Sequence, residues 1–140
     1  MLSGIMADAR DDWWLIGSAA VALHGADPGT IADVDVVLSE ADARHIFTLQ
    51  GIPSAPGIAD ERFVSKIFAT WSDAPLRVEF MAGLHRSEGG VWQPVRPRTR
   101  VAVERDGWRV FVPARTELAE ILRSFGRPKD QLRLAALEAL

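Results

Sequence analysis

Alternating apolar and polar stretches divide the first part of the chain into predicted elements. Residues 13–16 are continuously apolar, and Gly17-Ser18 then leads into a short alanine-rich segment. A second apolar run, with the sequence DVDV, begins at Asp33. This order predicts a strand, a turn, a short helix, a loop and a second strand. Successive side chains of a strand alternate between its two faces, so Asp33 and Asp35 should point one way and the valines into the core.

The next segment has the periodicity of a helix. Ser39 followed three residues later by Asp42 is typical of a helix start, and Gly51 is expected to end the helix. The predicted apolar face consists of Ala43, Ile46, Phe47 and Leu49. Residues 51–61 are dense in Gly, Pro and Ala and predict a loop.

Two strands joined by a turn are predicted in the middle of the chain. Residues 63–71 are rich in β-branched and aromatic side chains, and a similar run begins at Leu76 after a turn over residues 72–75. We expect these runs to form an antiparallel pair. On the second strand, one face should carry Leu76, Val78 and Phe80, and the other Arg77, Glu79 and Met81.

The last third of the chain predicts short strands followed by two helices. Strands are expected around Trp92 and over residues 101–103 and 108–112, where they could extend the sheet. Pro113 fits the first turn of a helix that Gly126 ends, and Pro128 begins the final helix. The apolar positions of these two helices are Leu118, Ile121, Leu122, Phe125, Leu134 and Leu137.

Length and composition are those of a single ordinary globular domain over residues 1–140. The chain is 48% apolar and 25% charged, and its lack of cysteine excludes disulfides and thiolate metal sites and fits a reducing cytoplasm. The start of the chain is acidic, unlike a secretory signal, and no apolar run approaches the roughly 20 residues that span a bilayer. We therefore expect a cytoplasmic protein with no membrane partner.

The net charge of −3 is distributed unevenly. Residues 1–70 hold 4 Lys/Arg against 10 Asp/Glu, whereas residues 71–140 hold 12 against 9. An acidic half that faces an arginine-rich half across a cleft would suit a polyanion bound with a metal ion. Ordinary solvation of the surface explains the same distribution equally well.

The two aspartates of the predicted second strand form a candidate metal site. Neighbouring carboxylates repel each other unless cations lie between them. Mg²⁺, which prefers oxygen ligands, is the cation usually bound at such pairs. Glu79 is a third acid inside an apolar strand, and it either joins Asp33 and Asp35 from a neighbouring strand or lies on a solvated face. A chance pair of aspartates on a solvated strand is the alternative to a metal site.

Three motifs, taken in order, resemble the signature of the nucleotidyltransferase fold shared with DNA polymerase beta. They are an apolar residue before Gly17-Ser18, the spaced acids of residues 33–36, and VEF at residues 78–80. LHG at residues 23–25 and GRPKD at residues 126–130 resemble the small nucleotidyltransferases related to abortive-infection toxins. The resemblance covers residues 13–140. It implies an α+β fold with a mixed β-sheet, helices mainly on one face, and C-terminal helices.

The resemblance also implies Mg²⁺-dependent transfer of a nucleotidyl group from an NTP to a hydroxyl on RNA, a protein or a small molecule. Gly17 would let the backbone approach the triphosphate, and Ser18 would offer its hydroxyl to phosphate oxygens. Asp33 and Asp35 would hold two magnesium ions, and Glu79 would complete the one that contacts the acceptor. Pyrophosphate would leave after in-line attack, so neither a histidine base nor a nucleophilic serine is required.

The main departure from the family pattern concerns a cation near the phosphates; the long spacer between Ser18 and Asp33, and Leu122 where a lysine is frequent, are others. The arginine that often precedes a threonine in small members is absent before Thr30, so a cation expected near the phosphates is missing. Lys66, Arg77, Arg127 and Lys129 are candidates to replace it, because an NTP with its metal remains negatively charged. A solvated surface role is the alternative for each of them.

Two other functions stay open. A domain of the same fold could bind nucleotide or a partner protein without turnover, as the missing arginine suggests, or its carboxylates could have no role. We expect the five tryptophans in the core and at its rim rather than stacked on a base, and His24 as a packing or capping residue. A homodimer or a separately encoded partner could supply a surface for the acceptor.

Overall fold

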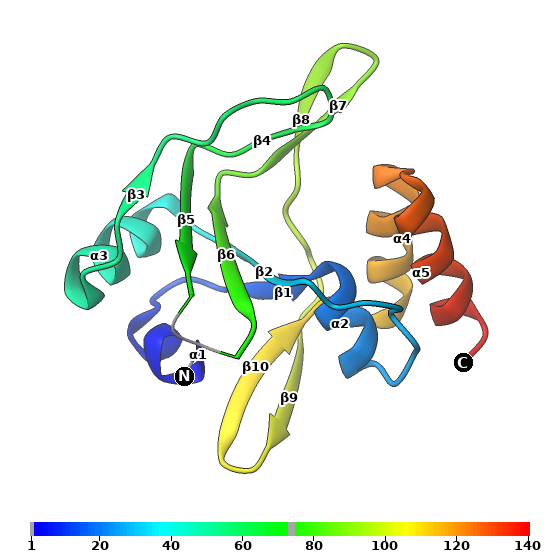
Figure 1. The fold of residues 1–140 in the computed structure, drawn as a ribbon, viewed down its shortest axis with the longest axis horizontal. Coiled ribbons are helices and arrows are strands. Elements are labelled where there is room, and N and C mark those ends of the chain that lie inside the picture. The colour runs from blue at the N-terminus through cyan, green and yellow to red at the C-terminus, as the bar shows by residue number, and fades with distance from the viewer. Residues whose placement is uncertain (1, 73–74) are drawn as a thin grey trace.

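A mixed sheet of five strands forms the centre of the protein (Figure 1). The computed structural model describes residues 2–72 and 75–140. The strands of the central sheet, in spatial order, are β1 (Trp14–Ile16), β2 (Asp33–Leu38), β6 (Arg77–Ala82), β5 (Ile67–Trp71) and β3 (Ser54–Ala55). Strands β2 and β6 are parallel and the other neighbours antiparallel, so the chain has the predicted α+β class with a mixed sheet.

Helices close one face of this sheet. They are α1 (Leu2–Ile5), the 3₁₀ turn η1 (Met6–Asp8), α2 (Gly17–Leu23) and α3 (Glu40–Gln50). Val36 of β2 and Phe80 of β6 are fully buried among apolar side chains of these helices. The strand period of two therefore places the valines in the core, as predicted, and turns Asp33 and Asp35 to the other face.

Helix α3 shows how local sequence sets an element and where the prediction misses. The Ser39 hydroxyl accepts a hydrogen bond from the Asp42 amide at 3.1 Å, and Gly51 ends the helix with a φ of 65°. Ala43, Ile46 and Phe47 are buried as predicted, whereas Leu49 is 57% exposed. Although Leu49 lies three positions after Ile46, it is about 120° around the helix axis from Ala43 and so falls at the edge of the apolar face.

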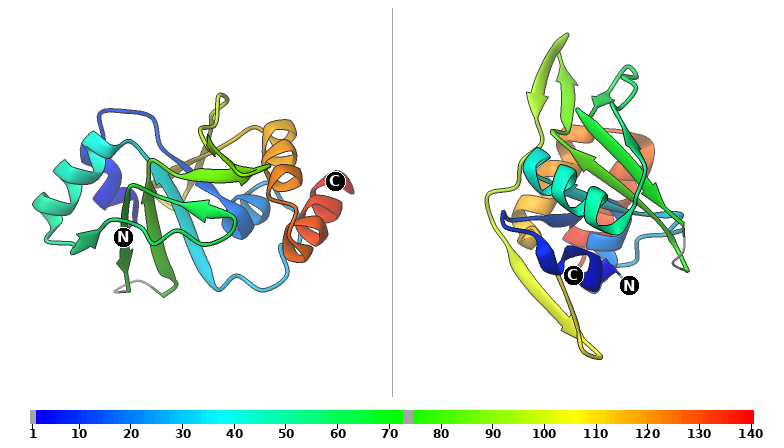
Figure 2. Two further views of the ribbon diagram at one scale, coloured as in Figure 1. Left: turned by 90° about the horizontal axis from the view of Figure 1, so that it is seen from above. Right: turned by 90° about the vertical axis from the view of Figure 1, so that its left-hand side faces the viewer.

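The opposite face of the central sheet is only partly covered. A three-stranded sheet of β4 (Phe63–Val64), β7 (His85–Glu88) and β8 (Val91–Pro94) lies over it. Helices α4 (Arg115–Phe125) and α5 (Pro128–Glu138) lie at the end of the molecule opposite α3 (Figures 1 and 2). Phe125 of α4 joins Trp14, Ile16 and Leu84 in a small second core on this face.

The predicted antiparallel pair forms between β5 and β6, but two other features of the predicted strands are wrong. The run at residues 63–71 is broken after Val64, because the Lys66 amide bonds to Ala82 of β6, so β4 and β5 belong to different sheets. The strands β9 (Val101–Arg105) and β10 (Trp108–Val112) form a separate hairpin that does not extend the sheet. Val110 and Val112 enter the main core, so β10 packs against the sheet instead of pairing with it. The β7–β8 and β9–β10 hairpins project from opposite sides of the molecule (Figures 1 and 2).

The start of α4 also differs from the prediction. Pro113 lies before the helix, because Ala114 is the N-cap and the Pro113 carbonyl accepts a 2.8 Å hydrogen bond from His24 Nε2. His24 ends α2, so its predicted packing and capping role is confirmed. Gly126 and Pro128 end and begin helices as predicted. The predicted turn at 72–75 includes residues 73 and 74, which lie outside the described residues.

Within residues 2–72 and 75–140, each helix is too short or too polar to cross a lipid bilayer.

Candidate active site

The three acids singled out in the sequence lie on one face of two neighbouring strands. Parallel pairing of β2 with β6 sets Asp35 directly beside Glu79, and Asp33 beside Arg77. Side chains directly opposite each other in neighbouring strands lie close together, and positions two apart share a face. Glu79 therefore approaches the aspartates from the adjacent strand, on the face that the helices leave open.

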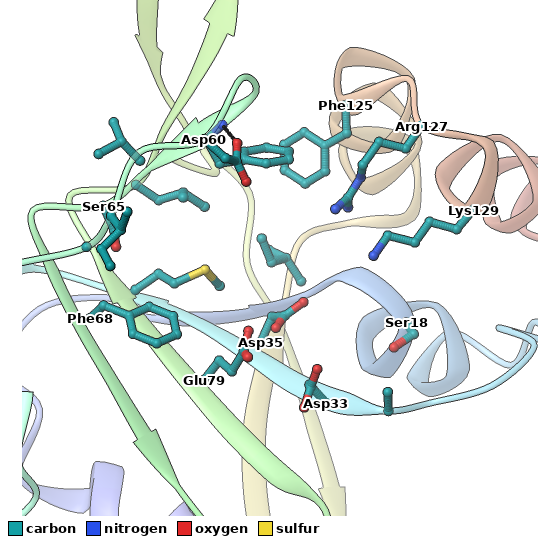
Figure 3. A pocket seen from close by; sticks show the side chains of 18 of the residues that line it. Ser18, Asp33, Asp35, Asp60, Ser65, Phe68, Glu79, Phe125, Arg127 and Lys129 are labelled. Atoms are coloured by element: carbon teal, nitrogen blue, oxygen red, sulfur yellow. Dashed lines mark hydrogen bonds between the residues drawn. The ribbon is translucent and has the colours of Figure 1, made fainter.

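These acids form the floor of a cavity of about 520 Å³ (Figure 3). The segment 55–65 and Phe68 line one end, and the junction between α4 and α5 lines the other. A volume of this size is typical of a small-molecule or cofactor site. The described residues that line the cavity include no tryptophan, and Trp13 and Trp14 are buried in the cores, as predicted for these side chains.

The Asp35 carboxylate lies so close to the backbone at position 17 that only glycine fits there without strain. Gly17 has a φ of +68°, a conformation that favours glycine, and a Cβ at this position would lie 3.0 Å from Asp35 Oδ2. The Asp35 carboxylate thus fits against the bare backbone at the start of α2. The next residue, Ser18, is almost fully buried and lines the cavity (Figure 3).

Basic residues from the last helix face the acids across the cavity. Arg127 is the N-cap of α5, and Lys129 and Arg133 follow in its first two turns. The guanidinium of Arg127 donates to Asp130 through Nε at 2.6 Å and Nη2 at 3.1 Å, and Asp130 is completely buried. Such a bidentate contact fixes the direction of the guanidinium.

Aromatic rings hold Arg127 from the side. Its guanidinium carbon lies 5.0 Å from the centre of the Phe63 ring and 5.7 Å from that of Phe125, and these rings pack edge to face. Cation–π contacts at these distances are favourable. The cationic wall is therefore ordered before any ligand binds.

The negative charges of the three acids are balanced less completely than the positive charge of Arg127. Burial, followed by the charges of Glu79 and Asp33, raises the pKa of Asp35 to about 7, although Arg127 and Lys129 act in the opposite direction. Arg77 provides a direct counter-charge, with Nη2 at 2.9 Å from Glu79 Oε1 and Nε at 3.8 Å from Asp33 Oδ1. Asp35 has no such direct partner among the described ion pairs.

The chemistry of the floor fits a hard divalent cation. Asp33, Asp35 and Glu79 offer only carboxylate oxygens, which Mg²⁺ prefers, and their mutual repulsion leaves negative charge to be neutralised. As the side chains stand, however, no three Asp, Glu or His in the part of the chain described are grouped closely enough to hold a metal ion. Binding would require the carboxylates to rotate toward one another.

Six of the predicted site residues line one cavity: Ser18, Asp33, Asp35, Glu79, Arg127 and Lys129 (Figure 3). Gly17 lies against Asp35 just behind this surface. Lys66 is not brought to the cavity, because it packs over Gly83 and its Nζ lies 3.8 Å from Glu40.

Sequence reasoning missed Arg133 and the wall at residues 55–58, and it gave no role to Asp130, although this residue ends the GRPKD motif. Asp130 stands three residues after the helix N-cap, the position of the acidic partner in a capping box, and that spacing could have identified it. Arg133 lies one turn after Lys129 on the same helix. The wall at residues 55–58 has no periodicity that would reveal it.

Comparison with known proteins gives a match in structure but not in sequence. No protein-family model matches this sequence, and no curated protein matches it. A candidate nucleotidyltransferase from Thermotoga maritima has a similar structure, with 20% identity and a TM-score of 0.73 over 96% of this chain and 86% of that one. The lincosamide antibiotic adenylyltransferase LnuA, bound to lincomycin, gives 8% identity and a TM-score of 0.56 over 91% and 86%. This chain is therefore a nucleotidyltransferase-fold protein, as its three sequence motifs suggest.

Proposed function

We propose that the protein is a Mg²⁺-dependent nucleotidyltransferase that moves a nucleotidyl group from an NTP to a hydroxyl acceptor. The observation that carries this proposal is the parallel register of Asp35 with Glu79, which faces the cavity opposite Arg127 and Lys129. Acids that suit a divalent cation and bases that suit phosphates thus share one space of adequate volume. The similarity to nucleotidyltransferase structures supports the same class of reaction.

Each residue has a role that its position permits. Arg127 and Lys129 bind phosphate oxygens, and Asp130 acts as a positioning residue because it fixes the Arg127 guanidinium. Ser18 donates its hydroxyl to the same phosphates. Asp33, Asp35 and Glu79 would hold Mg²⁺, which when bound would lower the pKa of the acceptor hydroxyl and neutralise charge that develops at phosphorus. The proton of the acceptor leaves to solvent, and pyrophosphate departs toward α5.

The rest of the cavity favours a small-molecule acceptor. The described residues that line it include three basic side chains, and all three belong to α5 or its N-cap. Beyond the acids of the floor, the wall formed by residues 55–68 is mainly apolar, with Ala55, Pro56 and Phe68 among its members, although Asp60 also lines it. This end offers room for a nucleobase or a compact acceptor and little charge for an RNA backbone. LnuA, which resembles this chain in structure, is described as an antibiotic adenylyltransferase.

A transfer assay tests the proposal. Purified protein is incubated with each of the four NTPs, labelled at the α-phosphate, together with Mg²⁺ and a mixture of hydroxylated small molecules, and pyrophosphate release is measured in parallel. We expect Mg²⁺-dependent release with at least one NTP, and a loss of about 10²–10³-fold in Asp35→Asn. Asp106→Asn, a matched change in the turn between β9 and β10, should retain full activity, because asparagine also tolerates its positive φ of 49°.

A nucleotide-binding module without turnover is the second candidate function. The observation that favours it is the pairing of Arg77 with two of the three acids. It predicts that Mg²⁺-NTP raises the unfolding temperature while no pyrophosphate is released under any condition of the same assay. Release that disappears in Asp35→Asn would exclude this candidate.

A further inference from the structure

Arg77 stands at the edge of the acid cluster, where a cation is most needed. It is the residue of β6 that faces Asp33, and it lies on the same strand face as Glu79, two positions further on. Its guanidinium donates to Glu79 Oε1 at 2.9 Å and lies 3.8 Å from Asp33 Oδ1. One basic side chain thus spans acids on two different strands.

We propose that Arg77 is an internal counter-ion that occupies Asp33 and Glu79 in the metal-free protein and competes with a divalent cation for them. The inference rests on the proposed function, since it assumes that these acids are metal ligands. It assigns to Arg77 a regulatory effect on metal affinity, and it departs from the phosphate-binding role considered from the sequence.

The competition follows from the positive charge of Arg77 and from the way it orients the Glu79 carboxylate. A guanidinium beside a carboxylate neutralises part of the charge that would attract a divalent cation, and it repels that cation directly. Its hydrogen bonds also turn the Glu79 carboxylate toward Arg77. This explains why the three acids, although they share one face, are not grouped as ligands in the described part of the chain.

The side chain is free to move aside. Arg77 is 53% exposed, so it can release the acids and extend into water at small cost. Arg127 is different, because a fully buried aspartate and two aromatic rings hold it. Arg127 and Arg77 are therefore suited to different tasks: Arg127 to a fixed phosphate contact, and Arg77 to a displaceable contact with the acids.

A second strand arginine offers a matched control. Arg86 on β7 pairs with Glu88 two residues on, at 3.2 Å, which reproduces the spacing of Arg77 and Glu79. Neither Arg86 nor Glu88 lines the cavity. Any effect found for Arg77 but not for Arg86 is therefore specific to the acid cluster and is not a general result of removing an arginine from a strand.

Direct metal binding tests the inference without reference to catalysis. The dissociation constant of Mn²⁺, used as a probe for Mg²⁺, is measured from the electron paramagnetic resonance signal of the free ion in wild type, Arg77→Gln, Arg77→Lys and Arg86→Gln. We expect Arg77→Gln to bind Mn²⁺ roughly five- to tenfold more tightly than wild type. Arg77→Lys, which keeps the charge, and Arg86→Gln should remain within about twofold of it.

A thermal measurement separates this role from a merely structural one. Without metal, Arg77→Gln should unfold at a lower temperature than wild type, because Asp33 and Glu79 then lack their counter-ion. With saturating Mn²⁺, its increase in unfolding temperature should exceed that of wild type. A purely structural arginine would lower both temperatures equally.

The outcomes are distinguishable. Wild-type or weaker Mn²⁺ affinity in a folded Arg77→Gln variant overturns the inference while leaving the metal site in place. Absence of Mn²⁺ binding in wild type and Arg77→Gln alike overturns the metal site itself, and with it both the proposed function and this inference. Tighter binding in Arg77→Gln that is lost again in Arg77→Gln/Asp35→Asn supports the inference.

Discussion

The acidic floor of the cavity and its basic wall on α5 carry opposite charges, and they differ even more in how those charges are balanced. On the α5 side, Arg127 is paired with Asp130, a fully buried acid from the same helix. On the sheet side, Asp35 has two acidic neighbours and a pKa raised to about 7 by burial and by those neighbours. The charge of Arg127 is thus balanced within the protein, whereas the sheet side keeps uncompensated negative charge, an arrangement that suits the proposed metal complex of an anion.

The largest expected effect is on the sheet side, where Asp35→Asn separates stability from function. At pH 8 in the absence of metal, the variant should be more stable than wild type by about 1–2 kcal/mol, because an uncompensated and partly buried charge is removed. Transfer activity should fall by about 10²–10³-fold. Urea denaturation and the pyrophosphate assay measure the two effects. A variant that loses both stability and activity would show that the acid is structural.

On the α5 side, Asp130→Asn should lower the stability of the protein, whereas Asp35→Asn should raise it. Loss of the buried charge leaves Arg127 without its bidentate partner and weakens the capping box, so we expect a loss of about 2–3 kcal/mol in the free energy of unfolding. The affinity for Mg²⁺-NTP, followed by thermal shift, should fall as well.

The exposed pair between Arg123 and Glu138 is the control for that prediction. Both side chains are more than half exposed, so Glu138→Gln should cost less than about 0.5 kcal/mol. Equal losses in Asp130→Asn and Glu138→Gln would contradict the view that the α5 wall depends on its buried acid.

A smaller effect on stability is expected at the start of α2, where the backbone of Gly17 contacts Asp35. Gly17→Ala places a methyl group 3.0 Å from Asp35 Oδ2 at a φ of +68°, and we expect a cost of about 1–2 kcal/mol together with reduced activity. Gly25→Ala has a φ of +93° but meets no atom within 4 Å, so it carries the backbone cost alone. The difference between the two variants, measured by chemical denaturation, isolates the contact with Asp35. Equal costs would mean that the carboxylate is mobile.

The sequence predicts the acid floor better than the rest of the cavity, for a physical reason. Asp33, Asp35 and Glu79 lie in strands whose period of two fixes the face, so only the pairing of β2 with β6 had to be supplied by the fold. Arg127 and Lys129 lie on either side of Pro128, between a glycine stop and the start of the last helix, and both signals are visible in the sequence. Local patterns therefore placed the residues that carry the proposed chemistry.

The remaining wall depends on contacts that no local pattern records. The chain passes from one sheet to another at Ser65-Lys66, which carries Lys66 away from the cavity to Glu40. Asp60 then stabilises the turn before β4 by accepting hydrogen bonds from the amides of Arg62 and Phe63, each at 2.7 Å, and these bonds lower its pKa. The Asp60 turn is local, but the change of sheet at Ser65-Lys66 follows from long-range strand pairing, which a single sequence does not specify.

The passage of the chain from β4 to β5 limits how a substrate can reach the acids. Only Ser65 and Lys66 connect these strands, and two extended residues span at most about 7 Å. Arg62, next to β4, also bonds to the Phe125 carbonyl at the end of α4. With β5 on one side and this bond on the other, residues 62–66 are held as a fixed wall of the cavity, and the proposed substrate would enter beside it.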